Sequence, residues 1–204
     1  NTHAFPILVA GEQQFQETLA QICPDCEVDI IPSLLTDIAT EIPLKVVSAK
    51  QANPDLNYLV FGFGDMSIGV PEALSEARLE GEIFLTGHSP AGLNRVNILD
   101  GVELSYTEVP LGLLGWSVVD AFARHFAGVN VDEVGGLFPT QYLDSSTLTS
   151  VDQEIITGYQ QEFLELWGVA GGASSDDVRA FVEDFLKAPD LHITEALPEP
   201  PAGG

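Results

Sequence analysis

The chain has 204 residues, of which 31 are Asp or Glu and only seven are Lys or Arg, so its formal net charge is −24 at pH 7. A chain this acidic repels phosphate backbones and anionic membranes, and the composition excludes nucleic acid as a partner. Hydrophobic residues make up 45% of the sequence, which is enough for a core, yet no run approaches the roughly 18 apolar residues of a membrane span.

Short apolar runs alternate with stretches of helical periodicity over the first two thirds of the chain. The predicted strands are residues 5–10, 28–31, 58–63, 82–86, 102–107 and 138–143. The predicted helices are residues 11–22, 36–52, 66–77, 87–99 (a loop and then a helix) and 111–127. Pro43 is expected to kink or break the second of these helices. The alternation predicts an α/β fold of three layers, a mostly parallel sheet with helices on both faces.

The two cysteines stand in Cys23-Pro24-Asp25-Cys26, between a predicted helix and a predicted strand. A thioredoxin-like redox pair would instead follow a strand and open a helix. A zinc site would need two further ligands, and the four histidines show no partner spacing: His3, His88, His125 and His192. We therefore predict no metal and no cofactor. We favour a small structural disulfide over free thiols, which points to an oxidising compartment.

The composition changes after Asp144. Two helical patterns, residues 151–167 and 175–186, follow a polar linker and flank a glycine-rich hinge. The last residues, 198–204, are rich in Pro and Gly, which is typical of an extended or disordered tail. We expect three segments: an α/β lobe at 1–145, a C-terminal helical extension at 146–190 and the tail at 191–204.

No catalytic motif is assembled in the sequence. Gly62-Phe63-Gly64 resembles the start of a dinucleotide fingerprint, but the third glycine is misplaced and Asp65 stands in the loop that would face the pyrophosphate. The segment 87–92 contains Gly-His-Ser but lacks the Gly-x-Ser-x-Gly pattern of a nucleophile elbow. We therefore expect a binding protein rather than an enzyme.

Polar side chains follow three successive predicted strands at the point where each strand ends: Asp65, His88 with Ser89, and Glu108. Ligands of open α/β sheets bind at that edge. Such groups can hydrogen-bond hydroxyls, and the neighbouring Phe63 can stack on the face of a sugar. Asp65 and Ser89 could equally cap the helices that follow them. Three polar strand ends in succession favour a binding site.

The order and spacing of several motifs resemble the type I periplasmic binding proteins over residues 5–145. Asn53-Pro54-Asp55 before the strand is similar to that family's entry into an apolar strand, and residues 64–74 are similar to its Asn-Asp-x-x-Ala-x-Gly-x-x-x-Ala-Leu. The other similar segments are the strand and loop at 83–89, the Asp-Gly turn at 98–104 and the crossover at 108–128. Residues 159–169 look like the C-terminal extensions of ribose-type relatives.

The resemblance implies a protein of two lobes, joined by hinge strands, that closes over a sugar. This chain corresponds to the second lobe and the segment that returns to the first. Either the N-terminal lobe was removed or the protein is a reduced member, and the missing lobe or a second protomer is an expected partner. The cleft residues that the resemblance implies are Asp65, His88, Ser89 and Glu108, with Phe63 stacking on the ligand and Leu35 or Asp37 on the near wall.

Some positions depart from the family pattern. Gly11 stands where the family has an Arg, Ser89 where it has the sugar-binding Asp, and Gly64 where it has an Asn. Glu108 replaces a Gln or Asn before the crossover proline. Two of the usual charged contacts to a neutral sugar are lost, so the resemblance implies an unusual ligand or binding that has decayed.

The leading hypothesis is a sugar-binding or polyol-binding module that serves an ABC importer through its permease, or a sensor. Its expected location is extracytoplasmic, in the periplasm or as a cell-surface lipoprotein. The effector domain of a LacI-type regulator shares the fold, but the net charge, the Cys-x-x-Cys and Trp167 argue against it. A further alternative is a non-catalytic module that dimerises through the faces left open by an absent lobe.

Overall fold

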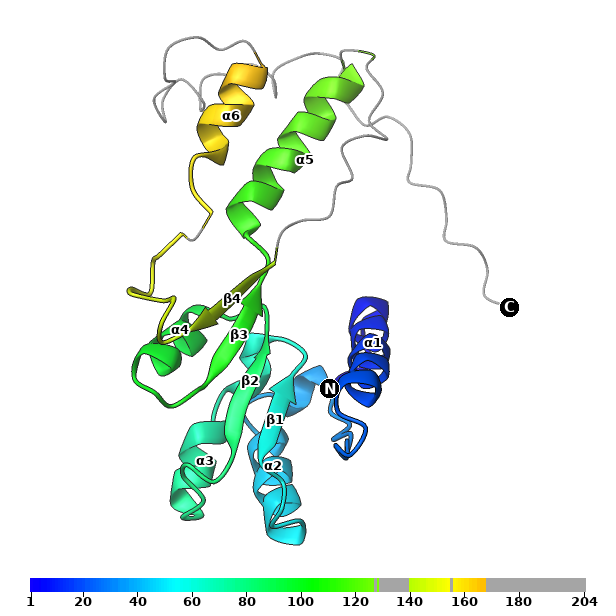
Figure 1. The fold of residues 1–204 in the computed structure, drawn as a ribbon, viewed down its shortest axis with the longest axis vertical. Coiled ribbons are helices and arrows are strands. Elements are labelled where there is room, and N and C mark those ends of the chain that lie inside the picture. The colour runs from blue at the N-terminus through cyan, green and yellow to red at the C-terminus, as the bar shows by residue number, and fades with distance from the viewer. Residues whose placement is uncertain (127, 129–139, 155, 168–204) are drawn as a thin grey trace, which may run out of the picture. The chain divides into compact units, whose positions relative to one another are not determined.

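The computed structural model describes residues 1–126, 128, 140–154 and 156–167 (Figure 1). The chain divides into two compact units, Asn1–Ile156 and Thr157–Gly204, and each is described by itself. The predicted helix at 175–186, the glycine-rich hinge and the predicted tail lie outside the described residues. Among the helices of the described part, none combines the length and the hydropathy of a membrane span.

A four-stranded sheet organises the first unit. Its strands, in spatial order, are β1 (Tyr58–Phe61), β2 (Phe84–His88), β3 (Ser105–Glu108) and β4 (Gln141–Asp144). The first three strands run parallel, and β4 pairs antiparallel with β3. The predicted α/β fold with a mostly parallel sheet is confirmed.

Three helices connect or precede these strands: α2 (Glu41–Ala52), α3 (Val70–Glu76) and α4 (Gly92–Leu99). Short 3-10 turns, η1 (Leu35–Asp37) and η2 (Gly64–Ser67), lie before α2 and α3. Pro43 and Pro71 both fall in the first turn of their helices, where a backbone N–H has no partner within the helix. The predicted kink at Pro43 is therefore wrong, because the helix begins only at Glu41.

One face of the sheet packs on helices. Successive side chains of a strand point to opposite faces, and Leu85 and Phe61 are 2% and 4% exposed, whereas Tyr58, Val60 and Phe84 on the other face are about half exposed. The core residues are Ile42, Val46, Phe61, Met66, Val70, Leu74, Ile83, Leu85, Ile98, Tyr106, Leu143 and Leu148.

Gly87, in the middle of the sheet, allows a close approach of two neighbours. A Cβ at this position would lie 2.7 Å from the Tyr106 ring and 2.9 Å from the Phe61 carbonyl oxygen. In the ladder Gly87 is paired with Phe61 on one side and with Tyr106 on the other. The absence of a side chain thus makes room for the buried Tyr106 ring.

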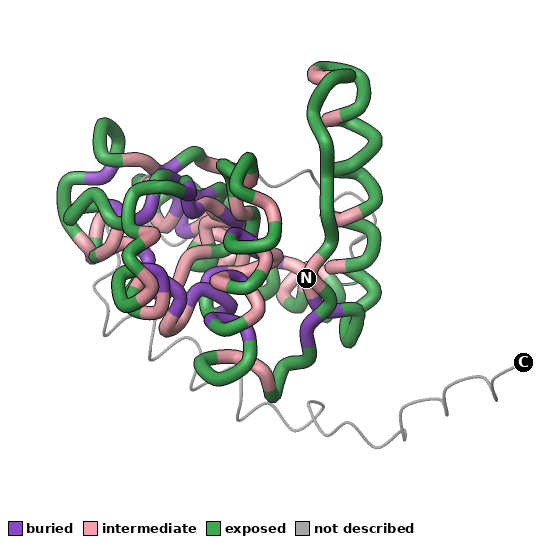
Figure 2. The backbone as a smooth tube through the Cα atoms, turned by 90° about the horizontal axis from the view of Figure 1, so that it is seen from below, coloured by how far each residue is buried: buried purple, intermediate pink, exposed green. Residues whose placement is uncertain are grey.

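Two strands predicted near the N-terminus are wrong. Residues 5–10 are not a strand, because Phe5 is the N-cap of α1 (Pro6–Ile22) and residues 6–10 belong to the helix. The apolar run at 7–9 fits either structure, and Pro6 at the first helical position favours a helix start. No residue of α1 is buried, as Figure 2 shows for the helix beside the N-terminus. Residues 28–31, also predicted as a strand, do not belong to the described sheet.

Two later helices complete the described structure. α5 (Leu111–Phe126) matches the predicted helix at 111–127, and the carboxylate of its Asp120 accepts a hydrogen bond from Arg124 Nε at 2.8 Å. In the second unit, α6 (Tyr159–Leu166) begins later than the predicted start at 151. The Gln153 side chain accepts the Thr149 N–H at 2.6 Å, and this local bond favours a turn over a helix there.

We expect Gly87→Ala to lower the free energy of unfolding by about 1–3 kcal/mol, because the new methyl group overpacks the contact with Tyr106 and Phe61. Urea denaturation followed by circular dichroism measures this change. Gly92→Ala is the matched control, since no atom lies within 4 Å of a Cβ there. Equal stability of the two variants would contradict the packing described for Gly87.

Candidate functional site

The carboxyl ends of the three parallel strands meet at one edge of the sheet, and backbone hydrogen bonds join the loops that follow them. The Gly64 N–H, after β1, donates to the Ser89 carbonyl oxygen at 3.0 Å. The Ser89 N–H, after β2, donates to the Thr107 carbonyl oxygen at 2.7 Å. The structure thus brings the predicted residues Phe63, Asp65, His88, Ser89 and Glu108 to a common edge.

Asp65 and Ser89 present free side chains at this edge. Both residues are exposed, and neither side chain makes a hydrogen bond or an ion pair within the described part of the chain. Neither caps a helix, because the residues at the N-caps of η2, α3 and α4 are Phe63, Gly69 and Ala91. Ser89 has φ +49°, a left-handed backbone that a non-glycine residue rarely adopts and that often marks a functional position.

Glu108 is held by a cation that the sequence analysis did not identify. Arg95 Nη2, from α4, contacts the two Glu108 carboxylate oxygens at 2.6 and 2.5 Å. Arg95 Nη1 donates to the carbonyl oxygens of Val151 and Gln153 at 3.0 and 2.9 Å. The side chains of Arg95 and Glu108 are only 13% and 18% exposed. The negative charge of Glu108 at this edge is therefore neutralised by the Arg95 guanidinium.

The other predicted residues also have protein contacts. The Lys45 Nζ donates to the Asp37 carboxylate at 2.6 Å, and this hydrogen bond, followed by one from the Leu34 N–H, lowers the pKa of Asp37. His88 Nδ1 lies 2.9 Å from Thr107 Oγ1. Phe63 is partly buried against the core. Lys45, like Arg95, was missed, because nothing in the sequence spacing identifies its partner.

A buried polar network holds the loops in place. Asn94 Oδ1 accepts the Ala91 N–H at 2.8 Å, and Asn94 Nδ2 points at Ser67 Oγ and Glu103 Oε2 at 2.8 and 2.9 Å. The same nitrogen lies 3.1 Å from Tyr106 OH. Burial, and next the charge of Glu103, raise the pKa of the Tyr106 phenol, so it remains a hydrogen-bond donor. Sequence reasoning missed this network as well.

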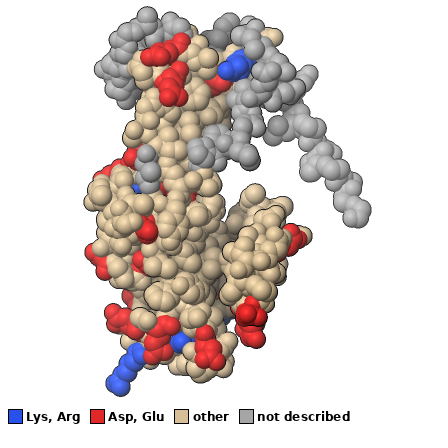
Figure 3. Space-filling view, viewed as in Figure 1, with Lys and Arg blue, Asp and Glu red and all other residues tan. Residues whose placement is uncertain are grey.

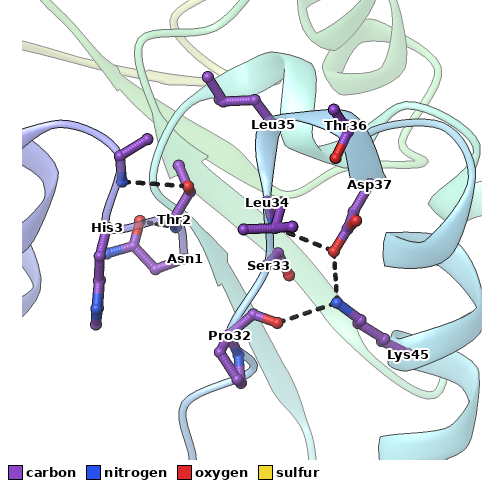
Figure 4. Close-up of a pocket in the computed structure, with 11 residues that line it drawn as sticks. Asn1, Thr2, His3, Pro32, Ser33, Leu34, Leu35, Thr36, Asp37 and Lys45 are labelled. Carbon is purple, nitrogen blue, oxygen red and sulfur yellow. Dashed lines mark hydrogen bonds and ion pairs between the residues drawn. The ribbon is translucent and has the colours of Figure 1, made fainter.

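The first unit also contains a hollow of about 790 Å³ (Figure 4). Its lining comes from residues 1–4, residues 32–37 and Lys45. Of the predicted ligand-binding residues, Asp37 is the one that lines it, together with Leu35 from the predicted near wall. Two segments thus form the hollow, and Asp65, Ser89 and Glu108 are not among its lining residues.

Charge and redox chemistry complete the description of the surface. On the face in view in Figure 3, acidic side chains clearly outnumber basic ones. Cys23 and Cys26 form a disulfide just after α1. Among the described residues, no group of three or more His, Cys, Asp or Glu is placed to hold a metal ion.

Comparison with solved structures shows which proteins share the fold of this chain. No family model and no curated protein matches the chain. An ABC transporter solute-binding protein from Agrobacterium vitis, bound with α-D-tagatopyranose, is 17% identical, with a TM-score of 0.59 over 68% of this chain and 45% of that one. A periplasmic solute-binding protein from Actinobacillus succinogenes with bound D-allose is also 17% identical, with a TM-score of 0.56 over 70% of this chain and 50% of that one.

A third similar structure covers more of the chain. The 5-methylthioribose transporter solute-binding protein from Thermotoga lettingae is 15% identical, with a TM-score of 0.52 over 84% of this chain and 54% of that one. The chain therefore spans about half the length of these solved structures. The likeness confirms the predicted fold, that of the type I periplasmic binding proteins.

We expect Arg95→Met to lower the free energy of unfolding by about 1–3 kcal/mol, because it leaves the largely buried Glu108 carboxylate and two carbonyl groups without this donor. Thermal and urea unfolding at neutral pH measure the loss. Arg78→Met removes the same charge from an exposed residue that forms no ion pair with the described residues, and should change stability far less. Similar losses in both variants would show that the Arg95 contacts contribute nothing specific.

Proposed function

We propose that this lobe binds a small polyhydroxylated molecule, a sugar or a related polyol, without catalysing a reaction. The observation that carries the proposal is the pair of unpartnered side chains, Asp65 and Ser89, at the carboxyl edge of a parallel sheet. Ligands of open α/β sheets bind at this edge. A carboxylate and a hydroxyl are suited to accept and donate hydrogen bonds to sugar hydroxyls.

The charges at the edge favour a neutral ligand over an anion. Arg95 at the edge is already paired with Glu108, and Lys45 in the hollow is paired with Asp37. An anionic substrate would face a free Asp65 carboxylate with no unpaired cation beside it among the described residues. A neutral hydroxylated molecule avoids that repulsion. The partly buried Phe63, two residues before Asp65, would supply an apolar surface for a sugar ring.

The setting of this lobe in a larger assembly is also part of the proposal. Proteins of the same fold are solute-binding proteins of ABC transporters, and we propose that role for the complete protein, with a second lobe closing the cleft and a permease as partner. The disulfide between Cys23 and Cys26 supports an oxidising, extracytoplasmic location. We retain the division into a lobe at 1–145, a helical extension at 146–190 and a tail at 191–204.

A melting assay with a panel of neutral sugars and polyols, including tagatose and allose, tests ligand binding on this chain and on the complete gene product in parallel. A ligand at a hundredfold excess over its Kd should stabilise the protein by about 2.7 kcal/mol. Glucose 6-phosphate serves as the anionic comparison and should give no shift. Stabilisation by the phosphate alone, or silence across the whole panel with the complete gene product, would refute the proposal.

We expect Asp65→Ala to weaken binding of the ligand so identified by about 10-fold to 100-fold, the effect of losing a hydrogen bond to a charged group. Isothermal titration calorimetry measures the change. Asp55→Ala removes the same charge from an exposed residue before β1, at the opposite end of that strand, and should leave the affinity unchanged. An equal effect of both variants would mean that Asp65 acts only through the overall charge.

A further inference from the structure

Two chain segments that are far apart in the sequence meet at the guanidinium of Arg95. Its Nη2 contacts both carboxylate oxygens of Glu108, the last residue of β3. Its Nη1 donates to the carbonyl oxygens of Val151 and Gln153, which follow β4, at 3.0 and 2.9 Å. One side chain of α4 therefore joins the carboxyl edge of the sheet to residues 151–153.

Both of the joined segments lead away from the sheet. After Glu108 the chain continues into α5, and it re-enters the sheet at Gln141, the residue of β4 that is paired with Glu108. Residues 145–154 follow β4 and lead to the second unit, which begins at Thr157. Arg95 thus contacts the chain where it leaves β3 and again where it has left β4.

The segment 145–154 has an apolar anchor near its start and a polar anchor near its end. Leu148 is 2% exposed and belongs to the core. The Gln153 side chain accepts the Thr149 N–H at 2.6 Å and donates to the Thr147 carbonyl oxygen at 3.0 Å, so it closes a local turn. The main-chain carbonyl groups at the end of this turn are the ones that Arg95 holds.

The Glu108 carboxylate decides whether the guanidinium can remain in this place. The side chains of Arg95 and Glu108 are 13% and 18% exposed, so the charge of Arg95 is largely withdrawn from water. Such a cation requires an opposite charge, because neutral carbonyl groups alone do not offset its lost hydration. Hydrogen bonds between charged groups are also roughly twice as strong as neutral ones. Without the carboxylate, the guanidinium would turn toward water and release both carbonyl oxygens.

We propose that Arg95 couples the ionised Glu108 carboxylate to the anchoring of residues 151–153, and thereby controls the segment that leads to the second unit. Coupling of this kind is a free energy that acts in both directions. It is a property of the ligand-free chain and stands without the proposed function. Its regulatory consequence rests on that function, because a ligand that competes with Arg95 for Glu108 would loosen the same segment.

Hydrogen exchange measured by mass spectrometry on the full chain, without a ligand, tests the coupling. Glu108→Gln keeps the shape of the side chain and removes its charge. It should speed exchange of residues 145–154 by about tenfold or more beyond any change at residues 86–87. Residues 86–87 of β2 are paired on both sides, so their exchange reports opening of the sheet. Glu82→Gln is the matched control, since it removes the same charge from a pair with Lys50, and should leave residues 145–154 unchanged.

A double-mutant cycle shows whether the effect passes through Arg95. Arg95→Met should speed exchange of residues 145–154 at least as much as Glu108→Gln does. Adding Glu108→Gln to Arg95→Met should give no further increase, because the connection is already lost. Arg95→Lys provides the same comparison if Arg95→Met does not fold, since its single nitrogen can pair with Glu108 but lacks the second nitrogen that holds the carbonyl oxygens.

The proposal is overturned if Glu108→Gln leaves exchange of residues 145–154 unchanged relative to residues 86–87. It is also overturned if Glu108→Gln has the same effect with and without Arg95, or if Glu82→Gln has an equal effect, because the carboxylate would then act by another route. None of these outcomes bears on ligand binding, which the melting assay tests separately.

Discussion

A single buried amide, Asn94 in the first turn of α4, joins the N-terminus of its own helix to the loop after β1 and to β3. It contacts the Gly64 carbonyl oxygen after β1, the Ala91 N–H before α4, and Tyr106 in β3. Buried polar groups without partners cost about 1–3 kcal/mol each, so the three segments are held where all of these bonds form together. The network thus fixes the loop after β1 and the start of α4, which carry Asp65 and follow Ser89, respectively.

Much of the fold could be predicted because its signals are local. The strand at Tyr58–Phe61 follows an Asn-Pro-Asp turn, and the alternation of strands with helices predicts a parallel sheet. The errors lie where a local signal has two meanings. The run at 7–9 fits a strand as well as a helix, and Pro6 starts the helix. Residues 28–31 have the composition of a strand, but pairing depends on a neighbour that is not in the local sequence.

Only part of the candidate site could likewise be predicted from the sequence. Asp65, Ser89 and Glu108 could be placed at one edge because the carboxyl ends of parallel strands meet there. The pairing of Glu108 with Arg95, and of Asp37 with Lys45, depends on how helices lie over loops. Asn94 looks like an ordinary helical residue until its surroundings are known. The residues proposed to contact a ligand could thus be predicted from strand order, whereas the residues that position and neutralise them required the three-dimensional structure.

The edge of β1 and the acidic composition have opposite effects on the protein in solution. Within the described residues one side of β1 has no partner strand. Such an edge, here with exposed side chains such as Tyr58 and Val60, can pair with the edges of other molecules. Mutual repulsion between chains with a formal charge of −24 resists that contact. Salt screens this repulsion, and acid removes it by protonating carboxylates. The colloidal stability of the chain is therefore electrostatic, and aggregation is favoured by high ionic strength or low pH.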